Sequence, residues 1–140
     1  APLEEDLTII GPLSCVLLGA SAAVDTDWAV RLTDVDEDGF SRQLCDGILR
    51  ARYRASHTEP SPLTPGEVVE FVVDLWATAN TFKARHCIRV AVCSSSFPRF
   101  DRNLGAWGVP AEGGSFCVQR NTVFHDALRP SRIVLPVIGR

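Results

Sequence analysis

An acidic run in the first half of the chain has the residue types of a calcium-binding loop. Asp34-Val-Asp36-Glu-Asp38-Gly39 matches the first half of an EF-hand loop, in which carboxylates alternate before a turn glycine. The EF-hand also needs a bidentate glutamate at loop position twelve, and Cys45 stands there. Strand-like sequences flank the run. The spacing therefore predicts a tight hairpin turn with exposed acids, and weak calcium binding is left as an open alternative.

Two further groups have the residue types of hydrolytic catalysis. Gly19-Ala-Ser21-Ala-Ala23 follows an apolar run, as a nucleophile elbow does, but the elbow needs glycine where Ala23 stands and a helix after it. Ser21 is therefore rejected as a nucleophile. His125 and Asp126 are adjacent, whereas a base and its carboxylate must meet a nucleophile through space, and no spacing identifies one. The sequence predicts no catalytic residue.

The cysteines and histidines do not form a metal-binding pattern. The five cysteines, at positions 15, 45, 87, 93 and 117, include no Cys-x-x-Cys pair, and the three histidines do not lie at zinc spacing from them. No metal site and no cofactor is expected. Reduced thiols in core or strand positions suit the cytoplasm. The uncharged run from Leu7 to Val24 follows acids and is broken by Gly11-Pro12, so no signal peptide or transmembrane segment is predicted.

The composition is that of a soluble globular domain, with 46% hydrophobic residues, 22% charged residues and a net charge of -3. Thirteen arginines and one lysine are spread among seventeen acids, which argues against nucleic-acid and membrane-surface partners. The densest basic stretch, Arg50-Ala-Arg-Tyr-Arg54, alternates and is interpreted as the solvated face of an extended strand. A chain of 140 residues has room for a single domain, residues 1–140.

The elements that must position these residues have the pattern of short strands separated by turns. Nine prolines and ten glycines interrupt runs in which apolar and polar residues alternate. Thr64-Pro-Gly-Glu67 has the form of a helix-capping box, but the valine-rich alternation after it predicts a strand. This pattern predicts an all-β fold, a two-sheet jelly-roll β-sandwich. The expected strands are Leu7–Ile10, Leu13–Gly19, Trp28–Val35, Phe40–Leu44, Gly47–Arg54, Glu67–Leu75, His86–Cys93, Ser115–Val118, Thr122–His125 and Arg132–Ile138.

The long irregular stretch from Ser94 to Gly114 contains the residue types of an interface. Loops of this length are commonly functional or interfacial. Aromatic and arginine side chains anchor many interfaces, and here they are accompanied by an aspartate and an asparagine. The two alternatives are docking to a partner and internal pinning of the loop by its own charges, and both can hold together. The candidate docking residues in this loop are Phe97, Arg99, Phe100, Asp101, Arg102 and Asn103.

Several blocks of the sequence resemble a known family. Along the chain they are Thr26-Asp-Trp28, Asp34 to Gly39, Asp46-Gly-Ile-Leu-Arg-Ala-Arg-Tyr-Arg54, Ala79-Asn-Thr-Phe-Lys83, Ser94-Ser-Ser-Phe-Pro-Arg-Phe-Asp-Arg-Asn103, and Thr122-Val-Phe-His-Asp126 with Pro130-Ser-Arg-Ile-Val-Leu-Pro136. In this order they resemble the C-terminal non-catalytic domain of serine hydrolases that include X-prolyl dipeptidyl-peptidases, cocaine esterases, α-amino-acid ester hydrolases and glutaryl-cephalosporin acylases. The resemblance runs from about Leu7 to Ile138.

The resemblance implies a galactose-binding-domain-like jelly roll that carries none of the catalytic residues. In the family, the catalytic triad belongs to an α/β-hydrolase domain upstream, so the 140 residues are expected to be a fragment of an esterase, acylase or dipeptidyl-peptidase. The implied role is to pack on the α/β-hydrolase and cap domains, to stabilise them and to help shape the substrate cleft. Trp76, Phe82 and Lys83 are second choices for the docking surface.

Two other functions remain open at this level. A carbohydrate-binding module could use Trp28, Trp76 and Trp107 to stack on sugar rings, although Trp28 and Trp76 lie in or beside strands, where burial is the simpler expectation. An oligomerisation domain is the other alternative, because an exposed apolar docking face would also pair with a second copy.

Overall fold

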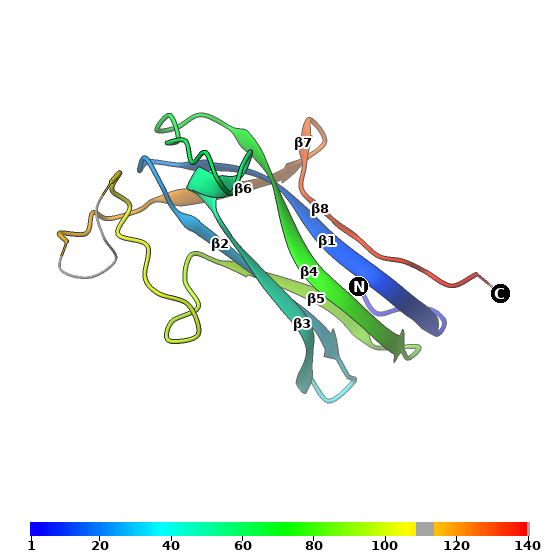
Figure 1. The fold of residues 1–140 in the computed structure, drawn as a ribbon. Coiled ribbons are helices and arrows are strands. Elements are labelled where there is room, and N and C mark those ends of the chain that lie inside the picture. Colours follow the sequence, from blue (N-terminus) through cyan, green and yellow to red (C-terminus); the bar gives the residue numbers. More distant parts are fainter. Residues whose placement is uncertain (109–113, 140) are drawn as a thin grey trace.

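The structure is a computed structural model that describes residues 1–108 and 114–139 (Figure 1). The larger sheet has the order β4-β1-β6-β7, with β8 also paired to β1, and the smaller sheet has the order β3-β2-β5. All these pairings are antiparallel. The strands are β1 (Leu7–Ser21), β2 (Asp27–Val35), β3 (Ser41–Arg50), β4 (Val69–Phe82), β5 (Cys87–Cys93), β6 (Asn121–Asp126), β7 (Arg129–Pro130) and β8 (Arg132–Val134). The predicted all-β class and the two-sheet sandwich are confirmed.

The core lies between the two sheets because alternate side chains of the long strands point inward. On β4, Phe71, Val73 and Leu75 are buried while the residues between them are exposed. On β2, Trp28 is buried and its ring lies 5.4 Å from the ring of Phe71 across the sandwich. The alternation that predicted these strands is therefore the same pattern that builds the core.

The first strand is longer than predicted. The Gly11-Pro12 pair was expected to form a turn between two strands, but β1 continues through it as one strand paired with β4. The register shifts between Pro12 and Ser14, as in a β-bulge, and Gly11 has a φ of 134°. A bulge accommodates the proline without ending the ladder, so the predicted turn is wrong. The expected break between Leu44 and Gly47 is likewise absent, and β3 is continuous.

The arginine-rich stretch after β3 is not a strand. Ala51–Tyr53 forms the 3-10 turn η1, in which Ala51 donates its N–H to the carbonyl of Thr26 at 2.8 Å. The prediction of a solvated strand face at positions 50–54 is wrong, because Arg50 and Arg52 turn toward buried carboxylates described below. The strand expected at positions 115–118 is also not formed.

The acidic hairpin turn predicted between β2 and β3 is confirmed. The Asp36 side chain accepts hydrogen bonds from the N–H groups of Asp38 at 3.1 Å and Phe40 at 2.9 Å, and Gly39 has a φ of 86°. This carboxylate is used to close the turn. Among the residues that the structure describes, no group of three or more His, Cys, Asp or Glu side chains is arranged to hold a metal ion. No helix in the described part of the chain is long and apolar enough to cross a membrane.

The two sheets approach each other closely where β3 passes β4. A Cβ atom placed on Gly47 would lie 1.8 Å from the carbonyl oxygen of Asp74, so only glycine fits between these two backbones. This close approach leaves a groove on the outer side of the seam, which is the part of the fold that positions the candidate site.

Candidate functional site

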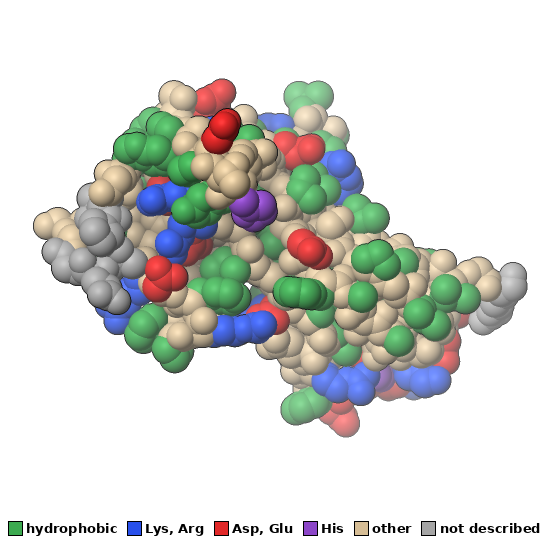
Figure 2. Space-filling model, viewed as in Figure 1, with side chains coloured by type: hydrophobic (Ala, Val, Ile, Leu, Met, Phe, Trp, Pro, Cys, Tyr) green, Lys and Arg blue, Asp and Glu red, His purple; other side chains and the backbone are tan. Residues whose placement is uncertain are grey.

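A groove of about 340 Å³ lies at the seam between β3 and β4. Its apolar lining comes from Ile48 and Leu49 of β3 and Val72 of β4. Figure 2 shows the face on which β4 lies, with hydrophobic side chains spread over it and charged side chains of both signs beside a hollow near its centre. The groove thus combines apolar and charged side chains on the open edge of the sandwich.

Three of the predicted docking residues, from two distant parts of the sequence, line this groove. Trp76 lines it from β4, and Arg99 and Phe100 line it from the long loop. Arg99 forms an ion pair with Asp46 of β3 and its guanidinium lies 5.3 Å from the centre of the Phe100 ring. The loop is therefore attached to the smaller sheet at the point where it faces Trp76.

Trp76 is presented to solvent by a strained backbone. Its side chain is 73% exposed and its φ is 65°, in the left-handed region that bulky residues rarely adopt. The Asp74 carboxylate accepts the Trp76 N–H at 2.8 Å and so stabilises this local turn. Strain of this kind is most often kept where it serves a function, and here it holds a large aromatic side chain beside the groove.

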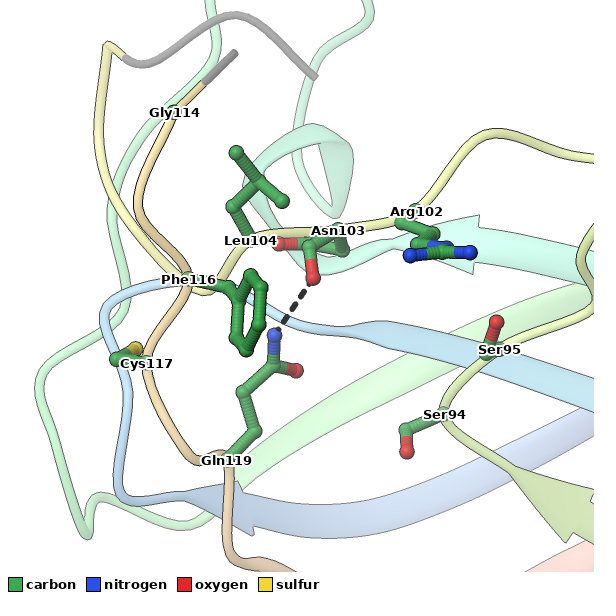
Figure 3. A pocket seen from close by; sticks show the side chains of 9 residues that line it. All are labelled: Ser94, Ser95, Arg102, Asn103, Leu104, Gly114, Phe116, Cys117 and Gln119. Carbon is green, nitrogen blue, oxygen red and sulfur yellow. Dashed lines mark hydrogen bonds between the residues drawn. The ribbon is translucent and has the colours of Figure 1, made fainter. Parts of the chain in front are cut away.

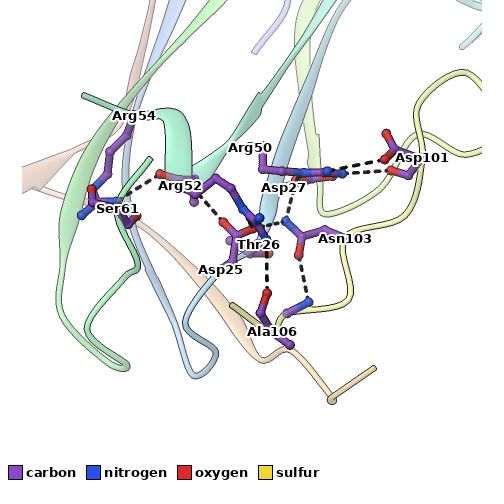
Figure 4. A network of polar contacts seen from close by, with 12 residues as sticks. Asp25, Thr26, Asp27, Arg50, Arg52, Arg54, Ser61, Asp101, Asn103 and Ala106 are labelled. Carbon is purple, nitrogen blue, oxygen red and sulfur yellow. Dashed lines mark hydrogen bonds and ion pairs between the residues drawn. The ribbon is translucent and has the colours of Figure 1, made fainter. Parts of the chain in front are cut away.

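The loop that reaches the groove is anchored on two buried carboxylates (Figure 4). Asp25 and Asp27 are 0% and 1% exposed and lie where the chain enters β2. The side-chain amide of Asn103 donates to Asp25 at 2.9 Å and to Asp27 at 2.8 Å. The Asn103 side chain therefore fastens the end of the loop to the body of the sandwich.

Two arginines supply the positive charge for these carboxylates. Arg50 pairs with Asp27 in a two-bond contact at 2.9 and 3.1 Å, and Arg52 pairs with Asp25 at 2.7 Å. The hydrogen bond to Asp27 raises the pKa of Arg50 above its usual value. Arg50 also lies 3.6 Å from the Asp101 carboxylate. The loop is thus attached to the smaller sheet by charge pairs, Asp101 with Arg50 and Arg99 with Asp46.

A second hollow of about 540 Å³ lies on another side of the same loop (Figure 3). Gln119 donates its amide N–H to the carbonyl of Asn103 at 2.8 Å there, and the other lining groups include Ser94, Ser95 and Arg102. Figure 3 shows these side chains spread around the hollow rather than converging on one point. It lacks a set of convergent charged groups, so the groove is the stronger candidate site.

The other predicted docking residues lie outside the groove lining. Phe97 is 58% exposed and the guanidinium of Arg102 lies 4.6 Å from its ring centre. Lys83 forms an ion pair with Asp6 at 2.8 Å. Phe82 is 0% exposed in the core, so its assignment to a docking surface is wrong, because the last residue of β4 points inward with the core face.

The three tryptophans do not form one sugar-binding platform. Trp28 is 2% exposed and cannot stack on a ligand without opening the core. Trp107 lies in the long loop with the guanidinium of Arg52 at 5.3 Å from its ring centre. Only Trp76 of the three lines the groove.

The described residues bring together no catalytic set. Ser21 is 2% exposed and its hydroxyl accepts the N–H of Ala23 at 3.1 Å. His86 lies 2.8 Å from Asp34, but within residues 1–108 and 114–139 no serine or cysteine side chain is hydrogen-bonded to a histidine. The five cysteines are free, and burial raises the pKa of Cys15 to about 11, which keeps that thiol protonated and unreactive.

Sequence reasoning missed the carboxylates that fix the loop. Asp25 and Asp27 flank Thr26 immediately before a strand, and the arginines that they bind lie at the end of the neighbouring strand. Asp27 and Arg50 are register partners on β2 and β3. The signal in the sequence was the presence of opposite charges at the ends of two neighbouring predicted strands. These charges can be recognised as a pair only when the register between the two strands is known.

The fold and the site thus define a two-sheet antiparallel β-sandwich domain with a surface loop that is anchored on buried carboxylates. The comparisons with known proteins identify the family of this domain. Residues 1–134 match the family of X-Pro dipeptidyl-peptidase C-terminal non-catalytic domains. The chain belongs to this family.

The chain is similar to parts of several hydrolases. It is 41% identical over 140 residues to a cocaine esterase of Rhodococcus sp. (strain MB1 Bresler), covering 99% of this chain and 24% of that protein. The structure matches an α-amino acid ester hydrolase with a TM-score of 0.92 at 33% identity, covering 99% of this chain and 24% of that one. It also matches an aminopeptidase of a marine sediment Thaumarchaeota archaeon with a TM-score of 0.91 at 31% identity, over 99% and 25% of the two chains. The chain thus spans about a quarter of the length of these relatives.

Proposed function

We propose that this domain packs on the α/β-hydrolase and cap domains of a longer serine hydrolase, stabilises them and helps shape the substrate cleft. The family assignment supports this proposal, since the family is non-catalytic, and the relatives named above are esterases, ester hydrolases or peptidases of about four times the length. The chemistry of the whole protein would then be attack of a serine on an ester or amide carbonyl, performed outside these residues. The free thiols fit a reducing compartment, so the proposed location is the cytoplasm.

The observation that carries the proposal is the preorganised surface around the groove. Exposed aromatic side chains at Trp76 and Phe97 stand on a strand and on a loop that ion pairs hold in place. Large apolar side chains that are exposed but rigidly supported are the usual anchors of protein interfaces, because little conformational entropy is lost on docking. Beside them, Asn103 and the buried carboxylates stabilise the loop geometry.

The proposal is tested by removing one anchor from the full-length hydrolase. Phe97→Gln is expected to lower the temperature of half-inactivation of its esterase or peptidase activity, because apolar surface at the domain contact is lost. Phe40→Gln is the matched control, since Phe40 is 67% exposed but lies in the β2–β3 hairpin. Equal thermal inactivation of the two variants would contradict the docking role.

A further inference from the structure

The lining of the groove includes the carboxylates of Asp46 and Asp74. Asp46 is paired with Arg99, so these two charges offset each other. Asp74 is exposed on the outer face of β4 and accepts the Trp76 N–H, but no lysine, arginine or histidine nitrogen among the described residues lies within ion-pair distance of its carboxylate. His57 also lines the groove, with its ring stacked at 6.2 Å from that of Tyr53. Among the described side chains that line the groove, Asp74 is therefore the carboxylate that is left unpaired.

Trp76 places an exposed aromatic ring beside this carboxylate. Elsewhere on the loop side of the domain, rings are covered by arginines of the same chain: Arg99 lies over Phe100, Arg102 over Phe97 and Arg52 over Trp107. No such pairing is found for Trp76 in the described part of the chain. An exposed indole beside an unpaired carboxylate is an arrangement that attracts a guanidinium or ammonium group, and Trp binds cations best of the aromatic residues.

The lining of the groove fits the rest of a long cationic side chain. Ile48, Leu49 and Val72 offer apolar surface against which methylene groups can pack. Asp74 and Trp76 line the same groove and offer a carboxylate and an aromatic ring to a charged end group. Arginine and lysine have this division between an apolar stem and a charged head. The volume of about 340 Å³ leaves room for one such side chain.

A cation at this position would offset the negative charge that docking removes from water. A partner surface that covered the groove would remove Asp74 from water, and burying an unpaired carboxylate is strongly unfavourable. An apolar anchor in the groove would leave that cost uncompensated, whereas an arginine or lysine would offset it and add the contact with the Trp76 ring. We propose that the groove between β3 and β4 receives an arginine or lysine side chain from the hydrolase domain of the same polypeptide. This inference rests on the proposed docking function.

Charge variants of Asp74 in the full-length hydrolase provide the first test. Asp74→Asn keeps an oxygen that can accept the Trp76 N–H but removes the charge, and Asp74→Lys reverses it. We expect the temperature of half-inactivation to fall in the first variant and to fall further in the second, because the partner's cation loses its counter-ion. Glu70→Lys is the matched control, since Glu70 is exposed on the same face of β4 but does not line the groove. If Asp74→Lys and Glu70→Lys have equal effects, the inference is wrong.

Photo-crosslinking identifies the occupant directly. Benzoylphenylalanine is placed at position 76 of the full-length hydrolase, and position 40 carries it as the control. The expected product is an intramolecular crosslink from position 76 to a hydrolase-domain peptide that contains arginine or lysine at the crosslinked segment, identified by mass spectrometry. A crosslink to a second copy, to a peptide without a basic residue, or no crosslink beyond that of position 40 would overturn the inference.

The two proposals can fail separately. If Phe97→Gln lowers thermal stability while Asp74→Asn and Asp74→Lys do not, the docking role stands and the cationic occupant of the groove is wrong. If Phe97→Gln and the Asp74 variants all behave like their controls, both proposals fail. Circular dichroism of each variant shows whether the β-sandwich is intact, so that loss of fold is not mistaken for loss of docking.

Discussion

Asn103 is the residue that joins the long loop to the buried charges. Its amide nitrogen donates to both Asp25 and Asp27, which are also bound by one arginine each. A buried carboxylate that loses a donor must be desolvated without compensation, and this costs more than an exposed hydrogen bond contributes. Asn103 therefore adds a neutral attachment of the loop to the ion pairs that Arg99 and Asp101 form with the smaller sheet.

Substitution of Asn103 tests this attachment. Asn103→Ala is expected to lower the free energy of unfolding by about 1–3 kcal/mol, since two buried acceptors lose a partner. Asn103→Asp is expected to be worse, because a third carboxylate would face Asp25 and Asp27. Urea unfolding of the two variants checks this order, and an aspartate variant as stable as the alanine variant would contradict the account.

The buried thiol of Cys15 predicts that the free energy of unfolding depends on pH in the alkaline range. Burial raises the pKa of this thiol from 9.0 to about 11, so the folded state keeps the proton that the unfolded state loses. The contribution of the protonated thiol to the free energy of unfolding is fully present below pH 9 and is lost as the pH rises toward 11. The total loss is about 2–3 kcal/mol.

The measurement compares unfolding free energies of the wild type and Cys15→Ala between pH 8 and 11. The alanine variant has a cavity at every pH but no thiol, so the difference between the two proteins is expected to narrow as the pH rises above 9. Parallel curves across this range would show that the buried thiol does not contribute.

At the scale of elements, β3 and β4 determine where the groove lies. They belong to different sheets and approach so closely that a Cβ atom on Gly47 would collide with the Asp74 carbonyl oxygen. A backbone oxygen cannot move aside as a flexible side chain can, so substitution must separate the two strands. Glycine is therefore needed at position 47 because a larger side chain would not fit between the strands, and not because of its backbone conformation.

Gly47→Ala is expected to destabilise the domain by about 1–3 kcal/mol, the usual cost of overpacking, with the change concentrated at the seam. Gly139→Ala is the control, because a Cβ atom at Gly139 meets nothing within 4 Å. Thermal unfolding compares the two variants, and equal midpoints would mean that the strands separate easily.

The positions of the strands could largely be predicted, but their ends could not. Alternation in β2, β4 and β5 reports which side chains face the core, and it is visible in any single strand. Gly11-Pro12 has the local chemistry of a turn, yet pairing with β4 retains it as a bulge. The Arg50–Arg54 stretch alternates as a strand would, but carboxylates distant in sequence fold it into η1. In both segments, tertiary contacts override the structure that the local sequence favours.

At the scale of the whole molecule, the fold class can be predicted from the alternation of apolar and polar residues, whereas the groove cannot. The β-branched alternation and the hairpin turns were sufficient to predict an all-β sandwich. The groove is made by edges of two sheets and by a loop that crosses between them, so its composition depends on strand order. Trp76, Arg99 and Phe100 were predicted as docking residues from separate blocks, but their meeting around Asp46 and Asp74 could not be derived from the sequence.

The central claim is that Trp76 in the groove and Phe97 on the neighbouring loop are covered by other domains in the full-length hydrolase. In the domain alone, Trp76 is 73% exposed, Phe97 58% and Phe40 67%, so the three side chains would be oxidised at rates set by similar exposure and by their intrinsic reactivity. Hydroxyl-radical footprinting of the full-length protein, normalised for that reactivity, measures these rates without any substitution. The account predicts oxidation of Trp76 and Phe97 several-fold slower than that of Phe40. Normalised rates that follow the exposures of the isolated domain would contradict it.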